Sequence, residues 1–308
     1  MTRPILHHYD LSPFAEKVRL AFGHKQVAWD SVEVPIWPPR LDMVPLTGGY
    51  RRIPALQIGA DVYCDTAMIL SELDRRYSDR ALYPAGQVGA VTAFAAWADA
   101  AGFMPAATLT TSIIGDGIPA EFIADRIAFM NHDFSLAASQ KAAAANRQRV
   151  TALIGIIADM LTDGRAFLFG DTLSAADLAA YHPLWFARSN GGEEITRMIP
   201  LDVLSPWMDR IATIGHGKRT TMTAADALAV ARNASPDPAE GVVADDPGGL
   251  VAGDAVLVQA DQANDPVRGI LVAANAREIV VRHDSDVAGT VHVHVPRFGY
   301  AVVREGDA

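Results

Sequence analysis

The chain has 308 residues, half of them apolar, and a formal net charge of -10. This length supplies enough apolar material for two or three domains with cores of their own, while the acidic balance and the lack of a basic cluster argue against nucleic acids and anionic membranes as partners. Because the sequence contains no apolar run of membrane-spanning length and opens on a strand pattern without a signal-peptide core, we expect a cytoplasmic protein.

The first predicted element is a strand over residues 4–9, which leads into a helix that begins at Ser12-Pro13-Phe14. Ser12 is a favourable N-cap, Pro13 suits the first helical turn, and the following apolar residues recur at helical spacing. A hydroxyl at a helix N-terminus, beside unpaired backbone N–H groups and the positive end of the helix dipole, stabilises an anion such as a thiolate. Two interpretations stay open at this point: Ser12 activates a bound thiol, or it only caps its helix.

The second informative stretch begins at Arg52-Ile53-Pro54, where Pro54 is expected to open the first strand of a hairpin. A helix is then expected to begin at Asp65-Thr66, because an apolar run with helical spacing follows. Thr66 and the backbone N–H groups at this N-terminus suit a ligand carboxylate, and the Asp65 carboxylate suits an amine. The pair therefore predicts a site for an amino-acid head group.

Residues 88–232 are rich in Ala, Leu, Ile and Met, and their apolar residues recur at helical spacing. This pattern predicts an all-α helical bundle. Within it, Ser174 and Asp177 have the spacing of a capping box at the start of a helix.

From about residue 250 the pattern changes to five short apolar runs separated by turns that contain Asp, Gly, Asn and Pro. These runs predict a small all-β domain, a barrel or a sandwich, over residues 250–308. His292 and His294 share one face of a predicted strand, but two imidazoles are too few for a metal site, and His283 would be a third ligand only from an adjacent strand. We therefore expect a polar outer face there and no metal.

Taken in this order, the Ser-Pro-Phe, Ile-Pro and Asp-Thr elements and the Ser174–Asp177 box resemble the cytosolic glutathione S-transferase superfamily. The resemblance covers roughly the first 230 residues. It implies a thioredoxin-like glutathione-binding domain over residues 1–77 and a helical substrate domain over residues 88–232. We therefore expect an α+β protein with an additional C-terminal β domain, and the resemblance also implies a homodimer.

The resemblance implies roles for the residues at matching positions. Ser12 corresponds to the residue whose hydroxyl stabilises the glutathione thiolate. Ile53 corresponds to the residue before a cis-proline, and the backbone of that residue pairs with the cysteinyl part of glutathione. The implied glutathione contacts are Arg52, Ile53, Pro54, Asp65 and Thr66. An apolar wall for the second substrate is expected from Phe14, Trp97, Phe103 and Met104, with core packing as the alternative for each.

The implied reaction is attack of the thiolate on a small hydrophobic electrophile, as conjugation, dehalogenation or peroxide reduction. One segment departs from the family pattern: residues 35–45 are rich in proline, which is expected to break the short helix that helps to hold the glycyl end of glutathione. Trp37, Arg40 and Arg51 are candidates to replace that contact. The alternative function is therefore a non-catalytic binding or scaffold protein of the same fold, whose C-terminal domain recruits a partner or caps the cleft.

Overall fold

The computed structural model describes residues 2–130, 132–239, 241, 246–261 and 265–307. Its contacts divide the chain into two compact units. Unit 1 combines residues 1–15, 28–72 and 218–308, and unit 2 combines residues 16–27 and 73–217. The helices α1 (Pro13–Lys25) and α3 (Thr66–Arg76) begin in unit 1 and end in unit 2.

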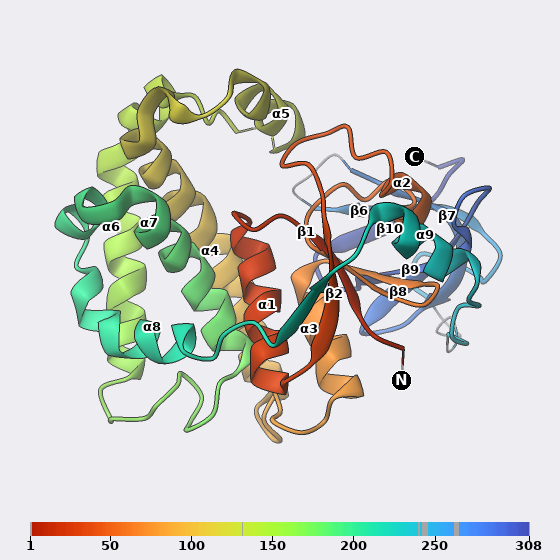
Figure 1. Cartoon of the computed structure of the whole chain (residues 1–308), viewed down its shortest axis with the longest axis horizontal. Coiled ribbons are helices and arrows are strands. Elements are labelled where there is room, and N and C mark those ends of the chain that lie inside the picture. Colours follow the sequence, from red (N-terminus) through yellow and green to blue (C-terminus); the bar gives the residue numbers. More distant parts are fainter. Residues whose placement is uncertain (1, 131, 240, 242–245, 262–264, 308) are drawn as a thin grey trace. The chain divides into compact units, whose positions relative to one another are not determined.

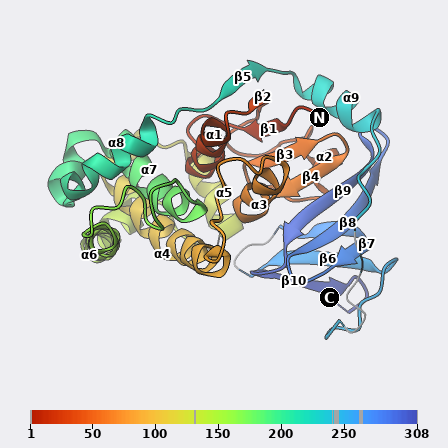
Figure 2. The ribbon, with the colours of Figure 1, turned by 90° about the horizontal axis from the view of Figure 1, so that it is seen from below.

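Unit 1 is built on one continuous mixed sheet with the strand order β10-β6-β7-β8-β9-β4-β3-β1-β2-β5 (Figure 2). The strands are β1 (Ile5–His8), β2 (Ala28–Glu33), β3 (Ala55–Ile58), β4 (Asp61–Cys64), β5 (Lys218–Thr221), β6 (Ala255–Ala260), β7 (Val267–Ala274), β8 (Glu278–Ser285), β9 (Gly289–Pro296) and β10 (Tyr300–Arg304). Among them β1 and β2 are parallel, β3 is antiparallel to β1, and β4 is antiparallel to β3. This is the predicted thioredoxin-like arrangement, and the α+β class is confirmed.

The five C-terminal strands, which the sequence suggests as a small barrel or sandwich, are antiparallel to one another and also continue the N-terminal sheet. The junction is a parallel pairing of β4 with β9 (Figure 2). The two strands are in register at Val62 and Val293. Val291, Val293 and Val295 are all buried in a core that also contains Val62. Since this core is shared, the C-terminal strands gain their burial from the N-terminal sheet as well as from each other.

Residues 218–232, expected within the helical bundle, contribute β5 and the helix α9 (Ala224–Arg232) to unit 1. The strand β5 pairs in parallel with β2, and all four of its residues are exposed. Its sequence, Lys-Arg-Thr-Thr, has no apolar alternation, because an exposed edge strand buries no side chain. The boundaries of the three predicted domains as folding units stay a prediction.

Unit 2 contains the long helices of the predicted bundle, in which α4 packs against both α6 and α7 (Figure 1). Its helices include α4 (Val88–Ile114), α5 (Ala120–Met130), α6 (Leu136–Met160), α7 (Ala175–Met198) and α8 (Ser205–Ala212), with 3-10 turns η1 (Gly115–Gly117) and η2 (Leu201–Leu204). The capping box is formed: Ser174 caps α7 and bonds reciprocally with Asp177. Among the described residues, no helix is both long enough and apolar enough to cross a membrane.

The proline-rich segment retains a short helix, contrary to the expectation that its prolines would remove it. This helix, α2 (Val44–Thr47), is one turn long and carries Pro45 in its first turn. Proline is tolerated there because the first N–H groups of a helix have no intrahelical acceptor.

A partly buried ion pair in unit 2 links α1 to α4. Lys17 Nζ lies 2.8 and 2.6 Å from the two carboxylate oxygens of Asp99, and His182 Nε2 lies 2.9 Å from Asp99 Oδ1. Burial opposes ionisation of Asp99, but Lys17 and His182 outweigh it and lower the pKa of this carboxyl. A carboxyl with a lowered folded-state pKa stabilises the fold above its unfolded pKa, and that contribution is lost as the pH falls below about 4.

We therefore expect Asp99→Asn to lower the free energy of unfolding by about 2 kcal/mol at pH 7, the scale of a hydrogen bond to a charged group. The deficit should shrink as the pH falls below about 4, because the carboxyl of the unfolded wild-type chain is protonated there and folding then requires the loss of that proton. Urea unfolding between pH 3 and 7 measures it. Asp209→Asn, which breaks an exposed pair with Arg188, serves as the control and should cost at most about 1 kcal/mol. A deficit that is constant down to pH 3 would contradict the assignment.

Candidate functional site

Three predicted site segments meet at one end of the sheet in unit 1. The antiparallel pairing of β1 with β3 sets His7 opposite Ala55, and the pairing of β3 with β4 sets Ala55 opposite Cys64. The end of β1, the beginning of β3 and the end of β4 therefore lie next to one another. The residues that follow β1, precede β3 and follow β4 are thus all found at this end of the sheet. These are the segments that carry Ser12, Ile53-Pro54 and Asp65-Thr66. We call this place the site end of the sheet.

Ser12 lies at the N-terminus of α1 and is only 2% exposed. Its Oγ accepts a hydrogen bond from the backbone N–H of Ala15 at 3.2 Å, so the predicted N-cap is formed. A serine hydroxyl has one donor hydrogen in addition to its acceptor lone pairs. Capping thus uses an acceptor position of Ser12 and leaves its O–H available as a donor.

The Ile53–Pro54 peptide bond is cis, as the resemblance implies. Asp65 precedes α3 and has a φ of 76°, in the left-handed region that non-glycine residues seldom adopt. Its Oδ1 accepts from the backbone N–H of Ala67 at 2.9 Å, which caps α3 and helps to hold the strained backbone. Strain of this kind costs about 1–3 kcal/mol and is concentrated at functional sites. Thr66 begins α3 and is buried.

Arg52 is held by residues that the sequence does not predict to lie at the site. Its guanidinium forms a two-point contact with Asp265, at 3.1 and 3.0 Å, and the carboxylate of Asp265 is fully buried. The same guanidinium lies 5.5 Å from the ring centre of Tyr50 and 5.8 Å from that of Tyr300. Arg52 is thus fixed by a carboxylate and two aromatic faces, a geometry that suits arginine and not lysine.

Tyr300, at the start of β10, also contacts the predicted head-group site. Its hydroxyl donates to Asp65 Oδ2 at 2.9 Å. The C-terminal segment therefore supplies two residues, Asp265 and Tyr300, to the group around Arg52 and Asp65. The sequence predicts the strand that carries Tyr300 but gives no signal for this contact, because the contact depends on how strands from distant parts of the chain pair.

The proline-rich segment after β2 is held together by Arg40. Its guanidinium donates to the backbone carbonyl oxygens of Pro35 at 2.7 Å, Ile36 at 2.5 Å and Arg51 at 2.6 Å. Arg40 is buried, whereas Trp37 is partly exposed. These contacts give Arg40 a structural task, so it is a weak candidate for the glycyl carboxylate.

The four residues expected to line the second-substrate site are divided between the units. Phe14 is in unit 1 and partly buried. Trp97, Phe103 and Met104 lie on α4 in unit 2, where Trp97 is 38% exposed and Phe103 packs near His182 and Phe186. Trp97 also borders a cavity of about 440 Å³ between α4 and α6, lined by Trp97, Ala100, Ala101, Pro105, Arg149, Ala152, Leu153 and Ile156. Their role in substrate binding stays a prediction.

The two histidines of β9 differ from the expected polar outer face. The face with Val291, Val293 and Val295 is buried as predicted, but His294 on the other face is buried as well. Its ring stacks on Tyr63 at 4.4 Å between ring centres, because β4 lies next to β9. The β4–β9 pairing covers this face, and the sequence alone does not reveal that pairing.

Comparisons with known proteins match both halves of the chain. The family model described as glutathione S-transferase, N-terminal domain, matches residues 6–81, and the model described as glutathione S-transferase, C-terminal domain, matches residues 140–210. The chain matches none of the curated proteins with which it was compared.

Solved structures extend the likeness to the whole chain. The structure of a GST-like protein from Pseudomonas syringae matches with a TM-score of 0.82 and 35% sequence identity, covering 99% of this chain and 100% of that chain. A glutathione S-transferase from Rhodospirillum rubrum F11 matches with a TM-score of 0.51 and 21% identity, covering 68% of this chain and 87% of that chain. The second match concerns the fold alone. The first includes the C-terminal strands, so these are shared with a solved relative.

Proposed function

The chain belongs to the glutathione S-transferase superfamily, and we propose that it activates the thiol of glutathione for attack on a small hydrophobic electrophile. The observation that carries this proposal is the convergence of the Ser12, Ile53-Pro54 and Asp65-Thr66 segments at the site end of the sheet. Each segment alone has a structural explanation. Together they supply a hydroxyl donor, a backbone edge and a head-group site within one unit.

In the proposed mechanism the O–H of Ser12 donates to the sulfur of glutathione. The free thiol has a pKa of about 8.5, and a donor at a helix N-terminus lowers it by stabilising the thiolate. Ser12 is buried, so water competes weakly for this hydrogen bond. The thiolate then attacks an electrophilic carbon, halide-bearing carbon or peroxide oxygen, and the leaving group departs with the displaced electron pair.

The γ-glutamyl end of glutathione is proposed to lie at the N-terminus of α3. Its carboxylate would contact Thr66 and the first backbone N–H groups of the helix, and its ammonium would contact Asp65. Tyr300 holds Asp65 Oδ2, and Arg52 is fixed beside it through Asp265. In this proposal Arg52 and the C-terminal residues organise the head-group site before the ligand arrives.

Two measurements on the full chain test the function. Calorimetry with glutathione is expected to give one site per chain, and a panel of aryl halides, alkyl halides and organic peroxides is expected to yield glutathione-dependent turnover on at least one class. A cytoplasmic location suits the proposal, because that compartment keeps thiols reduced. No heat and no turnover with any class would overturn it.

Asp65→Asn tests the head-group assignment. Asparagine tolerates the left-handed backbone of position 65 and still offers an oxygen to the Ala67 N–H, so the variant removes chiefly the negative charge. We expect its dissociation constant for glutathione to rise at least about tenfold, the loss of one charge-assisted contact. Asp226→Asn, at an exposed position in the first turn of α9, should leave the constant unchanged. Equal affinities for wild type and Asp65→Asn would contradict the assignment.

The contacts of the C-terminal segment also favour one alternative. Asp265 and Tyr300 already engage Arg52 and Asp65, which is the arrangement expected if the segment caps the site and the protein binds a partner without catalysis. The same calorimetry separates the two functions. If the C-terminal segment caps the site, calorimetry of the wild type should detect no binding of glutathione. Tyr300→Phe, which removes one capping contact, should then restore binding.

A further inference from the structure

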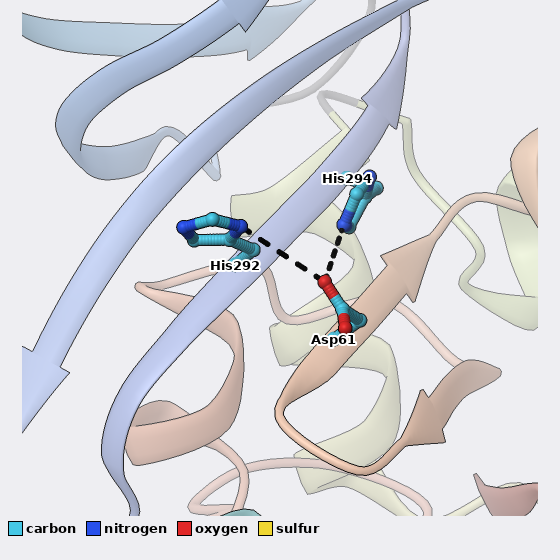
Figure 3. A group of neighbouring side chains, drawn as sticks. All are labelled: Asp61, His292 and His294. Atoms are coloured by element: carbon cyan, nitrogen blue, oxygen red, sulfur yellow. Dashed lines mark hydrogen bonds and ion pairs between the residues drawn. The ribbon is translucent and has the colours of Figure 1, made fainter. Parts of the chain in front are cut away.

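Three side chains from distant parts of the sequence converge in unit 1, where β4 pairs with β9 (Figure 3). Asp61 opens β4 and is in register with His292, and Tyr63 is in register with His294. The ligand atoms of Asp61, His292 and His294 all lie within 4.8 Å of one another. We propose that these three residues hold a divalent transition metal ion, with Zn²⁺ as the ion that best fits the donor set.

The atoms that converge are poorly explained by hydrogen bonding alone. Asp61 Oδ1 lies 3.0 Å from His294 Nε2 and 4.0 Å from His292 Nδ1, and the second distance is too long for a hydrogen bond. His292 Nδ1 is buried and has no hydrogen-bond partner within the described part of the chain. A buried polar atom in this condition costs about 1–3 kcal/mol. A metal ion would give this nitrogen a bond.

The opposite sides of Asp61 and His294 are already held by outer partners. His294 Nδ1 lies 2.9 Å from Glu278 Oε2, and Asp61 Oδ2 accepts from the backbone N–H of Asp237 at 2.9 Å. Outer contacts of this kind orient metal-binding imidazoles and carboxylates and fix which ring nitrogen keeps its lone pair.

The number of N–H groups on His294 also indicates that a cation binds here. A neutral imidazole has one N–H, and His294 faces carboxylate oxygens at both ring nitrogens, Glu278 on one side and Asp61 on the other. If Nδ1 donates to Glu278, the lone pair of Nε2 points at the oxygen of Asp61. Either an extra proton on His294 or a metal ion between Nε2 and Asp61 removes this repulsion. The unpartnered nitrogen of His292 favours the metal, because a proton on His294 leaves it without a partner.

Two imidazole nitrogens and one carboxylate oxygen form a donor set typical of Zn²⁺, with a fourth position left for water. Bonds of 2.0–2.2 Å place tetrahedral donors about 3.4 Å apart. The His292 nitrogen must therefore move inward by roughly 0.6 Å relative to Asp61, and by up to about 1.4 Å relative to His294, since the ligand atoms lie within 4.8 Å of one another. The side chain of His292 is 14% exposed, which gives the ion an entry path, while those of His294 and Asp61 are 8% and 3% exposed. The ion would join β4 to β9 and so fasten the C-terminal strands to the N-terminal sheet.

This metal site is separate from the proposed glutathione site. Asp61 starts β4, whereas Asp65 follows the end of that strand, which is about 10 Å long from Asp61 to Cys64 at 3.3 Å per residue. A variant at position 61 or 292 can therefore lose the metal while glutathione binding is retained. Failure of one proposal leaves the other testable.

The test uses the full chain, freed of metal with a chelator and then titrated with ZnCl₂ by calorimetry. We expect one Zn²⁺ per chain and a melting temperature about 5 °C higher at a hundredfold excess over the dissociation constant. Co²⁺ in place of Zn²⁺ should give the intense visible absorption of a four-coordinate site with nitrogen and oxygen donors. Wild-type protein that binds neither ion in stoichiometric amount overturns the proposal and leaves His294 as a buried imidazolium.

Variants then assign the ligands. His292→Asn and Asp61→Asn should abolish stoichiometric Zn²⁺ binding, and Glu278→Gln should weaken it about 10- to 100-fold, as loss of an outer partner does. His283→Gln, on the neighbouring strand β8, is the matched control and should bind as wild type. Because His292 is partly exposed, its variant is the least disruptive, and circular dichroism checks that it is folded. Zn²⁺ binding that survives in both His292→Asn and Asp61→Asn places the ion elsewhere and overturns the assignment.

Discussion

Ser12→Ala is expected to lower kcat/KM for glutathione-dependent turnover by about 10²-fold, the loss found when one donor to a developing anion is removed. Ser12 is buried at the N-terminus of α1, and its acceptor side is taken by the Ala15 N–H. The donor hydrogen is the part of this hydroxyl that the fold leaves for a ligand. Without it, the thiol pKa should return towards about 8.5, and the pH–rate profile should move to higher pH.

The same substitution also removes a helix cap, which costs about 1 kcal/mol of stability. Thr223→Ala separates the two effects. Thr223 caps α9 in the same way, with its Oγ accepting from the Asp226 N–H at 3.1 Å, and both residues are exposed. It should lose a similar amount of stability and keep wild-type kcat/KM. If Ser12→Ala retains wild-type turnover and pH profile, Ser12 is a cap and nothing more.

The parts of the site that the sequence predicts are those determined by local chemistry. The serine and proline before α1, the proline before β3 and the Asp-Thr pair before α3 each mark the start of an element, and the structure has those elements where the residues suggest them. N-caps and strand-opening prolines depend on a few neighbouring residues, so they can be read without knowing the fold.

The contacts of the site that the sequence does not predict all depend on which distant strands pair. Asp61 and His294 are separated by 233 residues, and Tyr300 and Asp65 by 235. An apolar alternation shows which face of a strand is buried, but it does not identify the neighbouring strand. The histidines of β9 therefore look like an outer face until β4 is placed beside them. The exposed strand β5 lacks even that signal.

Asp177→Ala is expected to lower the free energy of unfolding by about 4 kcal/mol, since it leaves several buried donors without an acceptor. Asp177 is fully buried. Its Oδ1 accepts from the Leu168 backbone N–H at 2.8 Å and from Trp207 Nε1 at 3.0 Å. Its Oδ2 accepts from the backbone N–H of Ser174 at 3.0 Å and from its hydroxyl at 2.6 Å. One carboxylate thus joins the start of α7 to the preceding loop and to α8.

The chain contains a matched control for this prediction. Thr223 and Asp226 form the same three-residue spacing at the start of α9, with the Thr223 hydroxyl donating to Asp226 at 2.6 Å, but that pair is exposed. Asp226→Ala should therefore cost at most about 1 kcal/mol, because water replaces the lost acceptor. Asp177→Asn keeps one acceptor oxygen and should fall between the two, which gives a measurable value even if Asp177→Ala does not fold. Urea unfolding followed by circular dichroism compares the three, and equal losses at positions 177 and 226 would show that the buried network adds nothing to the cap.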